Sequence, residues 1–363
     1  MTGMTGMTGM TGMTGMTGMT GMTGMASALQ ANTFGGYSGA IPYPLLYTGM
    51  DFSRESVSPG LAAPSERPAP YPQSGEAANL GYNDAQTRFH ILTQECLAGL
   101  EVAHFGRARG GIRLLYGQVP GQGAQSILEL RSPGPRTFGR QVQQVLDRRP
   151  DRAERMAEII TQVSPQFAYW ASTCRLHPER HRSTLELSWV LLHVVMLLTH
   201  RIKYELACPR PQDWNADVQP ILQTPAYYTW PSGHSTEAFF FATLMTHLRP
   251  GDPPQRVRLY RLASRIAENR EVAGLHFPLD TRAGEVLGTQ LARLFLARAG
   301  HGGHVRGWRV DGDDLPEAAP APREHELQAD PQEGIDDTGV DVPIARSRLL
   351  HWLWLKAAAE PRV

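Results

Sequence analysis

The sequence predicts an all-α protein, built as a bundle of helices around one apolar core. The first observation behind this prediction is that apolar residues recur at helical spacing in several separate segments between residues 83 and 359. The second is that 363 residues, 41% of them apolar, can bury a sizeable core. Only two short segments, near Ile112–Tyr116 and Ile127–Leu130, have the pattern of strands. The three cysteines exclude a disulfide-built scaffold and a cysteine-rich zinc module.

Residues that start or stop helices mark the ends of these segments. The first helical pattern begins at Asn83, a residue type whose side chain accepts hydrogen bonds from the first backbone N–H groups of a helix. The longest helix is predicted over 179–206, because Pro178 suits a first turn and Pro209 cannot continue a helix. Gly300 favours the end of the last long helix. The other helices are predicted over about 136–148, 151–163, 232–248, 254–270, 278–300 and 344–359.

Two apolar stretches are candidates for membrane spans. Trp189–Leu198 and Phe239–Met245 are both shorter than the ~20 residues that a membrane-spanning helix needs. We therefore expect a soluble chain with no transmembrane segment. Residues 1–25 have neither the basic region nor the apolar region of a signal peptide, so a cytoplasmic location is expected.

Segments of unusual composition flank the helical part of the chain. Residues 1–75 begin with Met-Thr-Gly repeats over 1–24 and continue without an apolar period, which predicts a disordered, low-complexity N-terminal segment. Residues 76–300 carry most of the helical patterns and form the predicted main domain. Residues 301–342 are acidic and Pro-rich and are predicted to be a linker, which a C-terminal helix in 343–363 follows.

Charge is balanced over the whole chain but uneven along it. There are 35 Lys and Arg residues against 35 Asp and Glu residues, so the overall charge gives no indication of nucleic-acid binding. The stretch from Asp311 to Asp341 holds 11 acidic residues and one basic residue, which leaves 34 basic against 24 acidic residues elsewhere. This cationic body is compatible with an anionic substrate. Lys203 and Lys356 are the only lysines, beside 33 arginines, as is typical of a GC-rich bacterial genome.

Three short segments carry the residues that could do chemistry, and together they suit a tetrahedral oxyanion. Arg210 and Arg270 can each offer a planar fork to phosphate oxygens, and Lys203 adds a compact charge. Ser232 and Gly233 open a helix, whose first backbone N–H groups can bind an anion that approaches closely at the glycine. The segments are Lys203–Pro211, Pro231–His234 and Arg270–Asp280.

Two histidines in these segments can divide the catalytic work. His276 lies just before Pro278, where a long helix begins, and Asp280 lies in the first turn of that helix. The carboxylate can accept a hydrogen bond from one ring nitrogen of His276 and leave the other nitrogen free to attack phosphorus. His234 can then donate a proton to the leaving group as a general acid. This chemistry needs no metal, because the cationic side chains neutralise the phosphoryl oxygens.

The arrangement resembles the type 2 phosphatidic acid phosphatase and vanadium haloperoxidase superfamily. That family carries Lys-x6-Arg-Pro, then Pro-Ser-Gly-His, then Ser-Arg-x5-His-x3-Asp, and every position matches here except Asn269, where the family has Ser. The resemblance covers about 76–300 and implies a helical bundle of the acid phosphatase and haloperoxidase type. It also implies that His276 is the nucleophile or the vanadium ligand. By the same resemblance, the oxyanion is held by Lys203, Arg210, Ser232, Gly233, His234 and Arg270.

Two functions are compatible with these motifs. The first is a metal-independent phosphohydrolase that acts on a phosphoric monoester or a lipid phosphate and needs no cofactor. The alternative is a vanadium-dependent haloperoxidase, in which vanadate on His276 oxidises halide with peroxide. The 35 residues between His234 and Arg270 are few for the family and favour the phosphatase. The expected partners are small molecules only, a phosphate ester or halide and peroxide, and the sequence does not indicate an oligomeric state.

Overall fold

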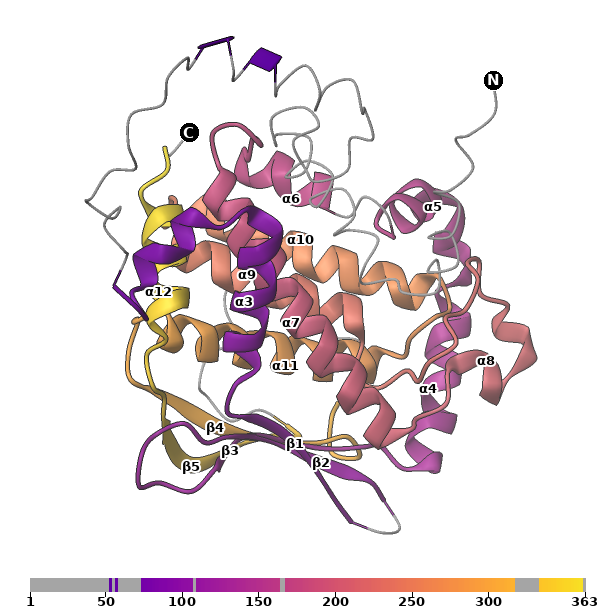
Figure 1. Ribbon diagram of the computed structural model, residues 1–363. Coiled ribbons are helices and arrows are strands. Elements are labelled where there is room, and N and C mark those ends of the chain that lie inside the picture. Colours follow the sequence, from indigo (N-terminus) through magenta and orange to yellow (C-terminus); the bar gives the residue numbers. More distant parts are fainter. Residues whose placement is uncertain are drawn as a thin grey trace.

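The computed structural model describes residues 52–53, 56–57, 73–106, 109–163, 167–316 and 333–361. Most of the predicted disordered segment, including all of the Met-Thr-Gly repeats, lies outside these described residues. The helices stack together on one side of a single sheet (Figure 1). The prediction of an all-α fold is therefore wrong. Helix accounts for 58% and strand for 13% of the described residues, so the fold mixes a large helical body with a five-stranded mixed sheet.

The sheet is built from two parts of the chain that are far apart in sequence. Its order is β1-β2-β3-β4-β5, with β3 and β4 parallel and the other neighbours antiparallel. β2 and β3 contain the two segments whose pattern indicated strands. β4 and β5 lie in or at the end of the predicted linker, which is the main departure from the sequence analysis. The strands are β1 (Leu100–Phe105), β2 (Gly111–Tyr116), β3 (Gln125–Arg131), β4 (His304–Asp311) and β5 (Ile335–Pro343).

The acidic strands are stabilised by contacts that reach across the sheet. Trp308 is 1% exposed and pairs in register with Leu128 on β3, so an apolar face of β4 is buried against the helices. Arg306 donates from Nε to both carboxylate oxygens of Asp337, at 2.8 and 2.9 Å, and from Nη1 to Asp341 at 3.0 Å. Three of the acidic residues that suggested a linker, Asp336, Asp337 and Asp341, therefore lie on β5, where Arg306 on β4 balances part of their charge.

Most helices follow the predicted segments, with shifts of a few residues at their ends, but α6 and α8 were not predicted. Asp84, not Asn83, caps the first α-helix, because its side chain accepts from the Thr87 backbone N–H at 2.7 Å. The α-helices are α3 (Ala85–Leu97), α4 (Pro135–Asp147), α5 (Arg152–Thr161), α6 (Phe167–Cys174), α7 (Arg182–Leu206), α8 (Pro211–Trp214), α9 (Gly233–Leu248), α10 (Pro253–Val272), α11 (Pro278–Arg298) and α12 (Arg348–Ala358). Three short 3₁₀ helices are η2 (Ala77–Tyr82), η3 (Arg149–Asp151) and η4 (Ala216–Val218).

Helix α11 forms the centre of the molecule, between α9 and the sheet (Figure 1). Its residues are buried on nearly every side. Two glycines let α9 approach closely, because a Cβ on Gly288 would lie 2.2 Å from the Thr236 carbonyl oxygen and one on Gly284 would lie 2.7 Å from that of Ser232. The backbone N–H of Ser232 also donates to the Asp280 carbonyl at 2.9 Å. The first turns of α9 and α11 are thereby brought together.

Helix α7 corrects the expectation that no segment could cross a membrane. By length and composition, the stretch Arg182–Trp214 is long and apolar enough to do so, and it is the one such stretch among the described residues. However, 72% of its most apolar window is buried inside the protein, and a core helix of a soluble protein meets the same criterion. A single helix of this kind is therefore weak evidence for a membrane span.

Candidate active site

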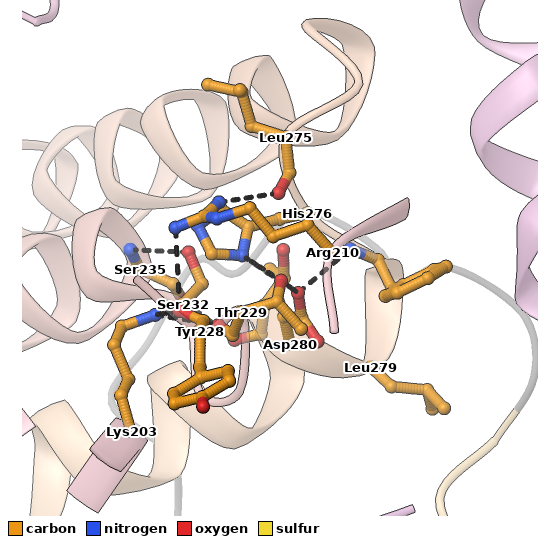
Figure 2. Close-up of polar contacts among 12 residues, drawn as sticks. Lys203, Arg210, Tyr228, Thr229, Ser232, Ser235, Leu275, His276, Leu279 and Asp280 are labelled. Carbon is orange, nitrogen blue, oxygen red and sulfur yellow. Dashed lines mark hydrogen bonds and ion pairs between the residues drawn. The ribbon is translucent and has the colours of Figure 1, made fainter. Parts of the chain in front are cut away.

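The three motif segments converge where α7 ends and where α9 and α11 begin. Figure 2 shows the side chains of Lys203, Arg210 and His276 gathered around the loop that carries Tyr228 and Thr229. The site is positioned by helix ends, which leave backbone groups unpaired and available to side chains. Among the predicted site residues, Gly233 is partly exposed. The others are buried, namely Lys203, Arg210, Ser232, His234, Arg270, His276 and Asp280.

Lys203 and Arg210 both donate hydrogen bonds to the main chain of the 227–229 loop. The Lys203 ammonium donates to the carbonyls of Tyr228 at 3.0 Å and Thr229 at 2.7 Å. Arg210 donates to Tyr227 at 2.8 Å, to Tyr228 at 3.5 Å and to Leu275, the residue before His276, at 2.9 Å. These contacts use two of the three lysine N–H bonds and three of the five arginine N–H bonds. Both cations therefore fix the loop as well as supplying charge.

His276 is held by a network in which one carboxylate oxygen accepts several hydrogen bonds. The His276 Nδ1 lies 2.8 Å from Asp280 Oδ2 and 3.0 Å from Thr229 Oγ1. Thr229 itself donates to the same carboxylate oxygen, and so does the Phe277 backbone N–H at 3.0 Å. Because the hydroxyl proton is directed to Asp280, Thr229 can only accept from His276, which assigns the ring proton to Nδ1. The Nε2 atom is then unprotonated, and no described residue makes a hydrogen bond to it.

The start of α9 carries the second histidine. Ser232 caps the helix and accepts from the Ser235 backbone N–H at 3.4 Å. The nearest atom to a Cβ placed on Gly233 would be Lys203 Cε at 4.0 Å, so the glycine faces the lysine across a narrow space. The His234 ring makes a hydrogen bond with the backbone of Gln162, while Nε2 is buried without a partner in the described part of the chain. His234 thus has one nitrogen held and one available.

Arg270 approaches the site from the end of α10 and is completely buried. Its Nη2 donates to the Ile159 carbonyl at 2.8 Å and to Gln162 Oε1 at 3.3 Å. In the described ranges its Nε and Nη1 have no partner. Asn269, the departure from the family pattern, donates to Gln162 Oε1 and to Glu158 Oε2, each at 2.9 Å. Asn269 therefore fastens α10 to α5 and does not enter the group of side chains around His276.

Burial shifts the pKa of every ionisable group in the site. It lowers the pKa of Arg270 to about 10 and moves that of Lys203 well below its ordinary value, the latter also because Arg210 lies nearby. Burial likewise holds the pKa of His276 well below the usual range, helped by the positive charges of Arg210 and Lys203. The pKa of Asp280 rises to about 6, since burial outweighs its hydrogen bonds. A buried cluster with several cations and one carboxylate is stabilised when an anion binds.

The pKa of His234 is lowered as well, as that of His276 is. Burial lowers it well below the ordinary histidine value, and the charge of Arg270 adds to the effect. An anion bound next to the ring would oppose both causes and favour the protonated form. Proton donation by His234 is therefore coupled to the presence of a negatively charged ligand.

Three residues of the site were missed by the sequence analysis. Thr229 and Gln162 contact motif residues that are distant in sequence, and no local pattern marks either one. Glu237 follows Gly233 by one helical turn, a spacing that could have placed it on the same face of α9. Burial raises the pKa of its carboxyl group to about 8, although the charge of Lys203 opposes this shift.

Comparison with known proteins agrees with this geometry. Within the ranges that the structure describes, no group of three or more His, Cys, Asp or Glu side chains could hold a metal ion. No curated protein matches the sequence. Residues 185–300, which include all three motif segments, match the family model of the PAP2 superfamily. This match supports the resemblance that the motifs indicated, and with it an activity of the phosphatase or haloperoxidase type in general.

Proposed function

We propose that the protein is a phosphohydrolase that cleaves phosphoric monoesters, including lipid phosphates, through a phosphohistidine on His276. The observation that carries this proposal is the fixed ring of His276. Its Nδ1 is held by Asp280 and Thr229, and its Nε2 is left free beside a buried cluster of cations. A nucleophile oriented in this way needs no further activation by a base, because Nε2 already bears its lone pair.

In the first step, the Nε2 of His276 attacks phosphorus and the bond from phosphorus to the leaving oxygen breaks. Positive charge from Arg270 stabilises the phosphoryl oxygens, since its Nε and Nη1 have no protein partner in the described ranges. His234 donates a proton to the leaving oxygen, which departs as an alcohol. The dianionic substrate itself favours the protonated form of His234, as the effect of nearby charge on its pKa requires.

In the second step, water replaces histidine on phosphorus. The now neutral His234 takes a proton from the water, whose oxygen bonds to phosphorus as the bond to His276 breaks. The products are inorganic phosphate and regenerated histidine, and His234 again carries its proton. Asp280 keeps the same ring orientation through both steps, because its contact with Nδ1 does not involve the reacting nitrogen.

Vanadate is the ligand of the alternative function, and the same residues fit it. The unpartnered nitrogens of Arg270 and the free Nε2 of His276 suit any tetrahedral oxyanion of this size. Lys203 and Arg210 would add charge to those contacts. Bound vanadate would supply the oxidation of halide by peroxide. The short connection between His234 and Arg270 favours the phosphatase.

A paired assay on the full-length protein tests the proposal. We expect phosphate release from an aryl phosphate, competitive inhibition by orthovanadate and no inhibition by EDTA. His276→Ala should abolish turnover, whereas His90→Ala, a change to an exposed histidine on α3, should not. Bromide oxidation with vanadate and peroxide, in the absence of phosphate release, would favour the alternative. Activity that survives excess vanadate but is lost to EDTA would contradict the mechanism.

A further inference from the structure

Helix α5 packs its C-terminal end against the end of α10 that carries Arg270. Arg265 and Glu158 form a two-pronged ion pair between the helices, with both N–O distances at 2.8 Å. One helical turn beyond Glu158 lies Gln162, whose side chain is completely buried. Its Oε1 accepts from Asn269 and from Arg270. Gln162 is therefore in direct contact with Arg270, one of the cations of the candidate site.

Gln162 also contacts the second catalytic group. Its backbone makes a hydrogen bond with the ring of His234, while its side chain holds Arg270. The residue thus fixes two members of the site from one position on α5, outside all three motif segments and outside the matched region 185–300.

The groups that hold Arg270 are all electrically neutral. Its hydrogen-bond partners are the Ile159 carbonyl and the Gln162 amide oxygen, both of which orient the guanidinium by dipoles alone. Other arginines at the same interface are paired with carboxylates, as Arg265 is with Glu158 and Arg155 is with Glu268 at 3.1 Å. A carboxylate in contact with Arg270 would neutralise it and compete with a bound anion. An amide avoids this competition.

The unpartnered atoms point to the same conclusion. Arg270 Nε and Nη1, His234 Nε2 and Gln162 Nε2 are all buried without a hydrogen-bond partner among the described residues. Buried polar groups are normally satisfied, so several orphaned groups on three neighbouring residues indicate a missing polar partner. An oxyanion with several acceptor oxygens would supply it.

We propose that Gln162 is a positioning residue of the phosphoryl site, which holds Arg270 and His234 through neutral contacts and so leaves the charge of Arg270 for the anion. The inference rests on the proposed function. It predicts that the shape and the charge of the side chain at position 162 have separate effects on anion affinity and on stability. Gln162→Glu keeps the shape and adds a competing charge, whereas Gln162→Met keeps the approximate length and removes both polar atoms.

The experiment measures orthovanadate binding by titration calorimetry and the melting temperature of each full-length variant. Gln162→Glu should bind vanadate about tenfold more weakly or worse, with a melting temperature equal to or above that of the wild type, because it gains an ion pair. Gln162→Met should lower both affinity and melting temperature. Arg265→Gln is the matched control, since it breaks an ion pair in the same interface without touching Gln162 or Arg270. It should lower the melting temperature and leave affinity unchanged.

The outcomes separate this inference from the proposed function. If the wild type does not bind vanadate, the oxyanion site itself is refuted, and the inference with it. If the wild type binds but Gln162→Glu binds equally well, only the inference is refuted. Equal losses of affinity in Arg265→Gln and Gln162→Met would also overturn it, because they would show a general effect of helix docking. If Gln162→Glu fails to fold, the affinities of Gln162→Met and Arg265→Gln for vanadate decide whether the inference stands.

Discussion

Thr229 offers the sharpest test of the network that holds His276. Thr229→Val has nearly the same shape but lacks the hydroxyl that donates to Asp280 and lies 3.0 Å from His276 Nδ1. Thr229 is fully buried, so water cannot replace the lost donor. Thr229→Ser is the matched control, because it keeps the hydroxyl and loses only a methyl group.

The magnitude follows from the charge of Asp280. A hydrogen bond to a charged group contributes about 1.5–3 kcal/mol, so we expect Thr229→Val to lower the free energy of unfolding by about 2 kcal/mol at pH 8. The folded pKa of Asp280 is about 6, above its ordinary 3.8, so the folded state binds this proton more tightly than the unfolded state. Stability from this group is present below pH 4 and is lost as the pH rises through 6. Loss of a donor raises that pKa further, so the deficit of the variant should grow between pH 4 and pH 8.

Urea unfolding at pH 4 and pH 8 measures this deficit directly, and the pH profile of kcat/KM measures its catalytic counterpart. We expect the acidic limb of the Thr229→Val profile to move to higher pH. We also expect turnover near pH 6 to fall about tenfold because His276 is less well oriented, which corresponds to an increase of about 1.4 kcal/mol in the activation free energy. Thr229→Ser should keep the wild-type profile. The reasoning is refuted if the valine and serine variants lose equal stability at both pH values, or if the valine variant loses more at pH 4.

Other predictions concern single residues. His234→Ala should slow the hydrolysis of an alkyl phosphate more than that of an activated aryl phosphate, because only the poor leaving group needs a proton, and equal losses in kcat/KM would show that His234 is not the acid. Arg210→Lys should lower both the melting temperature and the affinity for vanadate about tenfold, since one ammonium cannot replace three guanidinium contacts, and unchanged calorimetric affinity would contradict this. Burial raises the folded pKa of Glu271 to about 7 from 4.5. Ionisation of this group therefore lowers the free energy of unfolding by up to about 3 kcal/mol as the pH rises from about 4.5 to 7. The stability of Glu271→Gln relative to the wild type should therefore increase between pH 5 and pH 8. Urea unfolding that gives the same difference in unfolding free energy at both pH values would rule this out.

Much of the candidate site could be predicted from the sequence, because several of its contacts join residues that are close together in the chain. Ser232 caps α9 and Pro278 begins α11, as the order of residue types in the two motifs indicated. His276 and Asp280 are one helical turn apart, so their hydrogen bond follows from local geometry. Lys203 and Arg270 lie near the ends of α7 and α10, where the sequence predicted that two helices end. What it could not give was the contacts of Arg210 with the 227–229 loop, which depend on how that loop folds back.

The supporting residues were invisible in the sequence because their contacts are long-range. Thr229 meets His276 across 47 residues of chain, and Gln162 meets Arg270 across 108. Nothing near Thr229 distinguishes it from an ordinary loop threonine. Gln162 lies at the end of a short amphipathic helix, where a polar residue is typical of a solvent-exposed end. Only the docking of α5 on α10 buries it.

The same distinction explains the fold. Most of the helices could be predicted from the sequence, because apolar spacing, caps and prolines act within a few residues of one another. The sheet could not be predicted in the same way, since β4 joins β3 in parallel through the pairing of Trp308 with Leu128, far away in the chain. The acidic residues of β5 look like those of a linker until Arg306 pairs with Asp337. Helices are stabilised by near neighbours, whereas strands need distant partners, and for that reason the prediction of an all-α protein was wrong.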